Sequence, residues 1–109
     1  MTDDREQTAK DFHLAVNMTA AELDRWLGTR ESKAVGDKSG GGESIGHESG
    51  RRIAKILKKG NRDLSDDDYA HMRTVTGYIR RHLAQRPSGD VQATPWRHSL
   101  MNWGHDPLK

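Results

Sequence analysis

One long amphipathic segment constrains the fold of this chain more than any other feature. Apolar side chains recur there at intervals of three or four residues, which places them on one face of an α-helix. They are Tyr69, Met72, Val75, Ile79 and Leu83. Leu64 and Ser65, followed by three aspartates, predict a helix start with a staple, a cap and an acidic first turn. Arg80, Arg81 and Arg86 favour the helix end, and Pro87 terminates it.

Weaker signals predict further helices on both sides of this segment. Residues 4–16 carry apolar side chains at helical spacing, and Thr19-Ala20-Ala21-Glu22 is a capping box that opens a helix ending near Gly28. A third helix is expected from about Glu48 to Lys59, before Gly60. Thr94-Pro95 predicts an N-cap and a first-turn proline for a last helix, which Gly104 ends.

No segment shows the alternation typical of a strand, so we predict an all-α fold of four to five helices. A chain of 109 residues suits one domain, residues 1–109. The glycine-rich residues 36–46 are expected to form a flexible loop, because glycine is costly to order. Hydrophobic residues make up 32% of the chain and the mean hydropathy is -0.97. The core is therefore small, and a homodimer would be one way to enlarge it.

The composition also bounds the location and the chemistry of the protein. The chain has no cysteine, which excludes disulfides and thiolate sites and suits a reducing compartment. The amino terminus lacks the apolar run of a signal peptide, and no stretch approaches the roughly 18 apolar residues of a membrane span. We therefore expect a cytoplasmic protein without a membrane partner.

A basic helix is the most informative functional feature. Residues 51–62 contain six cations and no acid. A rotation of about 100° per residue groups Ile53, Ile56 and Leu57 on one side and the cations on the other. The second half of the chain, residues 51–109, holds twelve Lys/Arg against six Asp/Glu, whereas residues 1–50 hold six against ten. Such asymmetry is typical of proteins that bind polyanions.

These observations predict a non-catalytic nucleic-acid-binding protein, with DNA as the partner and weak sequence preference. Its phosphate contacts would supply most of the affinity. The predicted contacts are Arg51, Arg52, Lys55, Lys58, Lys59, Arg62, Arg80 and Arg81. The last two extend the surface only if their helix lies beside the basic one. The start of the basic helix, residues 46–52, adds small residues and free amides of the kind that hold a phosphate.

Two other interpretations of the basic face stay open. It is either a solvated face, neutralised by the acidic amino-terminal half or by Asp63 and Asp66 to Asp68, or a docking surface for an acidic protein or a second copy. In that second case the protein would be an interaction or adaptor module.

The remaining motifs are weak indications. Residues 42–46 match the G-x-S-x-G pattern of hydrolases around Ser44, but that motif needs a strand before it. We therefore predict no enzyme, with a hydrolase as the least favoured hypothesis. Six histidines lack H-E-x-x-H spacing, so we expect surface or capping histidines and neither a metal nor a cofactor. Trp96 and Trp103 are assigned to the core rather than to stacking on a partner.

Four strings of residues carry a family resemblance. They are residues 12–19, 42–52, 66–87 and 96–107, and the last begins Trp96-Arg97-His98-Ser99. Over nearly the whole chain the sequence resembles the small bacterial and fungal proteins grouped as domain of unknown function 3140. The resemblance implies one domain. Members are often labelled DNA-binding, which favours the nucleic-acid interpretation, but the family implies no catalytic residues.

Overall fold

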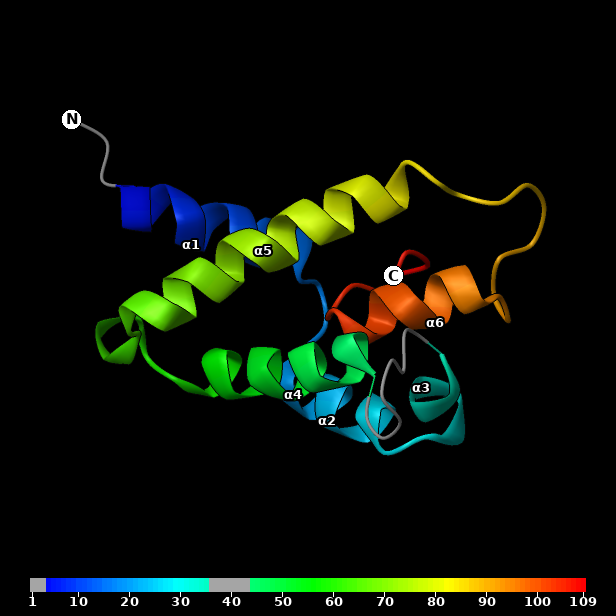
Figure 1. Cartoon of the computed structure of the whole chain (residues 1–109), viewed down its shortest axis with the longest axis horizontal. Helices are drawn as coiled ribbons and strands as arrows, with labels where there is room; N and C mark the ends of the chain where they lie inside the picture. Colours follow the sequence, from blue (N-terminus) through cyan, green and yellow to red (C-terminus); the bar gives the residue numbers. More distant parts are fainter. Residues whose placement is uncertain (1–3, 36–43) are drawn as a thin grey trace.

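The computed structural model describes residues 4–35 and 44–109, and within them the chain forms six α-helices, one 3-10 helix and no strand (Figure 1). The elements are α1 (Asp4–Ala15), α2 (Ala20–Leu27), α3 (Arg30–Ala34), α4 (Ile45–Lys58), η1 (Asn61–Asp63), α5 (Asp66–Leu83) and α6 (Pro95–Asn102). The all-α prediction is confirmed, although the number of helices is higher than predicted. The helix that the sequence did not indicate is α3, which has five residues and no apolar periodicity.

The helices pack as two pairs joined by α6. Helix α1 lies along α5 and runs in the same direction, whereas α2 packs against α4 (Figure 1). Helix α6 contacts α2, α3, α4 and α5. Because one short helix touches both pairs, the two pairs share a single core.

That core takes apolar side chains from both ends of the chain. Phe12, Leu23, Ile53, Met72 and Leu100 are all fully buried. Trp96 and Trp103 are 8% and 6% exposed, so their assignment to the core is confirmed. The predicted amphipathic stripe of α5 faces the same core, because Met72, Val75 and Ile79 are buried.

Helices α2 and α5 begin at the capping residues that the sequence predicted. The Thr19 side chain accepts a hydrogen bond from the Glu22 amide, and the Glu22 carboxylate accepts one from the Thr19 amide. Ser65 and Asp68 form the same reciprocal pair at the start of α5. Each cap satisfies amides that have no partner inside the helix.

The start of α4 corrects the predicted glycine-rich loop. Its residues 36–43 lie outside the described residues, but Ser44 is the N-cap of α4, and the helix begins at Ile45 rather than near Glu48. Gly46 is buried, and a Cβ at that position would lie 3.1 Å from Trp103 Nε1. Residues 44–46 are therefore an ordered first turn, because packing against the end of α6 offsets the entropy cost of the glycine.

Candidate nucleic-acid interface

Helix α4 separates its apolar and basic side chains as predicted. Ile53, Ala54 and Ile56 are buried, with exposed fractions of 3% or less. The five cations between residues 51 and 59 are all exposed. The helix therefore presents a basic outer face while its inner face packs against α2 and the core.

Part of this face forms a shallow hollow of about 320 Å³, which we call the α4 hollow. Its lining consists of four cations and two carboxylates, and these are Arg51, Arg52, Lys55, Lys59, Glu48 and Asp68. Lys55 makes no hydrogen bond or ion pair with any residue that the structure describes. The hollow thus combines an excess of positive charge with an exposed, unpaired ammonium group.

Two contacts reduce the charge that the α4 hollow can offer. Lys59 Nζ lies 2.7 Å from Asp68 Oδ2, and this hydrogen bond, with a further one from the Ser65 amide, lowers the pKa of the Asp68 carboxyl. Arg52 donates to the Asp67 carbonyl oxygen at 3.3 Å, which leaves its formal charge in place. The charges of Lys59 and Asp68 cancel, so the excess positive charge of the hollow comes from the two arginines and Lys55.

The other predicted contacts lie elsewhere on the molecule. Lys58 points toward α2, where its Nζ is 2.7 Å from Asp24 Oδ2. Arg62 is an exposed residue of η1 and lines a different hollow, formed with α1. Arg80 and Arg81 belong to α5 and do not line the α4 hollow. The eight predicted residues therefore do not line one common hollow.

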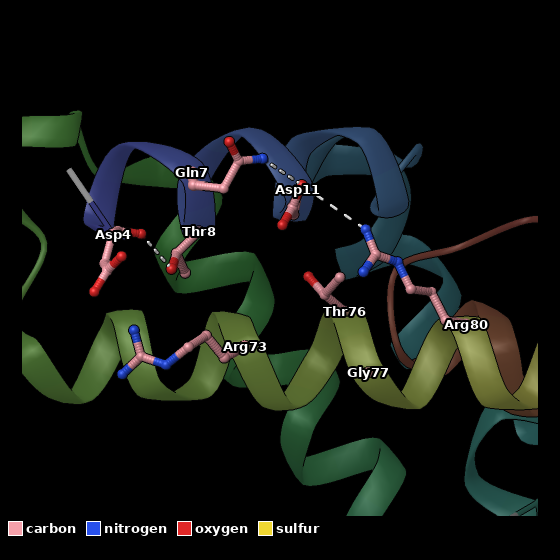
Figure 2. A pocket seen from close by; sticks show the side chains of 8 residues that line it. All are labelled: Asp4, Gln7, Thr8, Asp11, Arg73, Thr76, Gly77 and Arg80. Atoms are coloured by element: carbon pink, nitrogen blue, oxygen red, sulfur yellow. Dashed lines mark hydrogen bonds and ion pairs between the residues drawn. The ribbon is translucent and has the colours of Figure 1, made fainter. Parts of the chain in front are cut away.

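Arg80 instead lines a polar cleft of about 540 Å³ between α1 and α5 (Figure 2). Its Nη2 lies 3.8 Å from Asp11 Oδ1, and Gln7 donates a hydrogen bond to the same carboxylate. Asp4 from α1 and Arg73 from α5 line the cleft as well. Since two carboxylates face two guanidinium groups, this cleft has no excess positive charge with which to attract phosphate.

The histidine prediction is only partly right. His47 and His105 bond backbone carbonyl oxygens at 2.7 Å, as capping groups would. His71 is half-buried, and its Nε2 shares a hydrogen bond of 2.9 Å with Ser49 Oγ. Burial, followed by the charge of Arg52, lowers the pKa of His71, so the ring is neutral at pH 7 and does not add to the basic face.

An aromatic stack that sequence reasoning missed connects α5 to the end of the chain. The rings of His71, Trp103, Tyr78, His82 and Trp96 follow one another with interplanar angles of 14–18°. The spacing of His71, Tyr78 and His82 along α5 is the only signal in the sequence. Tyr78 and His82 stack on each other at a spacing of four residues, but Trp96 and Trp103 lie more than ten residues from their partners on α5, so only the tertiary structure reveals the whole stack.

Ser44 caps a helix rather than lying on a nucleophile elbow. Its Oγ accepts a hydrogen bond from the His47 amide at 3.1 Å, and the residue is 1% exposed. Among residues 4–35 and 44–109, no three His, Asp or Glu side chains are grouped so that they could hold a metal ion. In the same ranges, no helix has the length and apolar character needed to cross a membrane.

The sequence of the chain matches one known protein family. The family described as "Protein of unknown function (DUF3140)" matches residues 11–101, which include α2 to α5, all but the last residue of α6, and residues 11–15 at the end of α1. No curated protein and no solved structure matches the chain. Since the match covers most of its length, the chain belongs to the DUF3140 family of proteins of unknown function.

Proposed function

We propose that this protein is a cytoplasmic, non-catalytic DNA-binding protein that holds backbone phosphates in the α4 hollow. The observation that carries the proposal is the charge of that hollow, where Arg51, Arg52 and Lys55 outweigh Glu48. A guanidinium group can donate two parallel hydrogen bonds to a phosphate, and an ammonium group adds a point charge.

The arrangement of the cations along α4 favours an anionic partner. Arg51, Lys55 and Lys59 follow one another at intervals of four residues, so their side chains are neighbours on the helix surface. Like charges at this spacing destabilise a helix by a few tenths of a kcal/mol per pair. The Asp68 carboxylate relieves this repulsion at Lys59. A bound phosphate would relieve it at Lys55.

We expect weak sequence preference. Bases are distinguished mainly by bidentate contacts in the major groove, such as those of Asn or Gln with adenine. The α4 hollow contains no amide side chain for contact with adenine, and we propose that its arginines and lysines contact phosphates rather than base edges.

Fluorescence anisotropy of a labelled DNA duplex, titrated with protein at several salt concentrations, tests the proposal. The variant Arg52→Gln/Lys55→Gln removes two cations from the α4 hollow. The control Arg30→Gln/Lys33→Gln removes the same two residue types from the exposed surface of α3. Each lost phosphate contact should reduce the slope of log K against log salt by about 0.9, so the first variant should lose about 1.8 and the control nothing. Equal binding by wild type and the first variant would refute the assignment.

Docking of an acidic protein or of a second copy is the alternative. It is favoured by one observation, which is that Lys58 and Lys59 already bind carboxylates of this chain. A dimer that dissociates at high salt, in a protein without affinity for DNA, would select this function. Analytical ultracentrifugation at low and high salt measures it.

A further inference from the structure

A second basic hollow lies where α1 approaches the connection between α4 and α5. It has a volume of about 660 Å³, and we call it the α1 hollow. Six of its residues matter here: Arg5, Glu6 and Lys10 from α1, and Arg62, Leu64 and Tyr69 from the segment that follows α4. Because α1 packs along α5, residues about fifty positions apart in the sequence meet in one place.

The α1 hollow has an excess of positive charge. Three permanent cations line it together with one carboxylate, that of Glu6. Arg5 forms an ion pair with Asp66, and its guanidinium carbon lies 5.2 Å above the centre of the Tyr69 ring. Lys10 and Arg62 are exposed and form neither a hydrogen bond nor an ion pair with the described part of the chain. Those two cations are therefore available to a ligand.

The floor of the α1 hollow strengthens its attraction for anions. Leu64 and Tyr69 are half-buried and pack against the core. Apolar groups beside a charge lower the local dielectric constant, so an ion pair formed there is stronger than one in open solvent. An exposed Lys and Arg over such a floor can bind a phosphate, to which the guanidinium group can donate two parallel hydrogen bonds.

The two hollows flank one short segment of chain. Lys59 and Asp68 line the α4 hollow, while Arg62 and Tyr69 line the α1 hollow, so both include residues of the connection from α4 to α5. Figure 1 shows this connection at the end of the molecule where α1 and α5 begin. Two carboxylates of this region pair with cations that line the hollows, since Asp66 pairs with Arg5 of the α1 hollow and Asp68 with Lys59 of the α4 hollow.

We propose that the α1 hollow is a second phosphate-binding site, in which Lys10 and Arg62 hold the backbone of the same DNA that occupies the α4 hollow. This inference rests on the proposed function and extends it from one helix to a surface built from both ends of the chain. The two sites are separate contacts, because the exposed carboxylates of Asp63 and Asp67 lie in the segment between them.

Three matched variants test the inference in the full chain. Lys10→Gln/Arg62→Gln alters the α1 hollow, Arg52→Gln/Lys55→Gln alters the α4 hollow, and Arg30→Gln/Lys33→Gln alters α3 at the far end of the molecule (Figure 1). Each pair removes one Lys and one Arg, so all three proteins have the same net charge. A duplex of about 15 base pairs, about 50 Å long at about 3.4 Å per pair, exceeds the 43 Å length of the protein. Anisotropy measures the affinity for it across a salt series.

The expected result is a loss of about 1.8 in the salt slope for each hollow variant and no loss for the α3 variant. If the α4 variant loses slope and the α1 variant does not, the second site is refuted and the proposed function stands. If the α1 and α3 variants weaken binding equally, net charge explains the effect and the second site is also refuted. If the wild type binds no DNA, both the function and the second site are refuted. Circular dichroism confirms that each variant is folded.

Discussion

Gly50 and Gly77 lie inside helices α4 and α5, and we predict that replacing each with alanine changes stability in opposite directions. Alanine is favoured over glycine inside a helix by roughly 0.5–1 kcal/mol, because glycine loses more backbone entropy on folding. The structure determines whether the added methyl group has room. Gly50 is buried where α4 packs against α2 and the end of α6, whereas Gly77 is half-buried on α5.

At Gly50 the methyl group has no space. A Cβ would overlap the backbone carbonyl oxygen of Asn102 and would lie 2.7 Å from Leu27 Cδ2. A carbonyl oxygen cannot rotate away, so α4 must move from α6 at a cost of about 3 kcal/mol, the upper part of the range for overpacked cores. After subtraction of the helical preference for alanine, we expect Gly50→Ala to destabilise the protein by about 2 kcal/mol.

At Gly77 the methyl group meets only the end of a flexible side chain. The nearest atom is Arg81 Nη1, 3.1 Å from the added Cβ, and Arg81 is exposed and able to swing away. We therefore expect Gly77→Ala to stabilise the protein by about 0.5–1 kcal/mol.

Thermal and urea unfolding, followed by far-ultraviolet circular dichroism of the helices, measures both changes. For a domain of this size, about 1 kcal/mol shifts Tm by about 4–8 °C. Gly50→Ala should therefore lower Tm by about 10 °C, and Gly77→Ala should raise it by a few degrees. If Gly50→Ala were as stable as the wild type, the close approach of α4 to α6 would not exist in solution.

Three further measurements probe other contacts. Asn102 is 1% exposed and accepts hydrogen bonds from Trp26 Nε1 and Ser32 Oγ. Asn102→Ala should therefore lower the free energy of unfolding, measured in urea, by about 2–3 kcal/mol. An unchanged free energy of unfolding would show that this network is absent. Burial lowers the pKa of His82, so below pH of about 6.5 the unfolded chain takes up a proton that the folded state resists. Stability should therefore fall as the pH falls, and His82→Phe should weaken that dependence of Tm on pH, whereas an unchanged dependence would assign it to other groups. The Lys109 ammonium group lowers the pKa of Glu22 to about 2, so Lys109→Ala should raise this pKa toward its ordinary value in an NMR titration; an unaltered value would place the cause in the Thr19 cap.

The sequence alone determined the class of the fold and most of the helix starts. Helix caps act within three or four residues, so the pairs Thr19 with Glu22 and Ser65 with Asp68 are visible as local strings. The division of α4 into an apolar and a basic side follows from the rotation per residue, and Ile53 and Ile56 are buried as expected. These features depend on neighbours along the chain.

The tertiary structure decided which cations share a surface. Lys58 and Lys55 are three residues apart on one helix, yet Lys58 pairs with Asp24 of α2 while Lys55 lines the α4 hollow. Arg62 lines the same hollow as Lys10, and Arg80 pairs with Asp11, only because α1 packs along α5. The carboxylates that pair with Lys58 and Arg80 come from distant parts of the chain, and the periodicity of a helix cannot predict such contacts. Packing between helices therefore divided one predicted basic face into two hollows and a charge-balanced cleft.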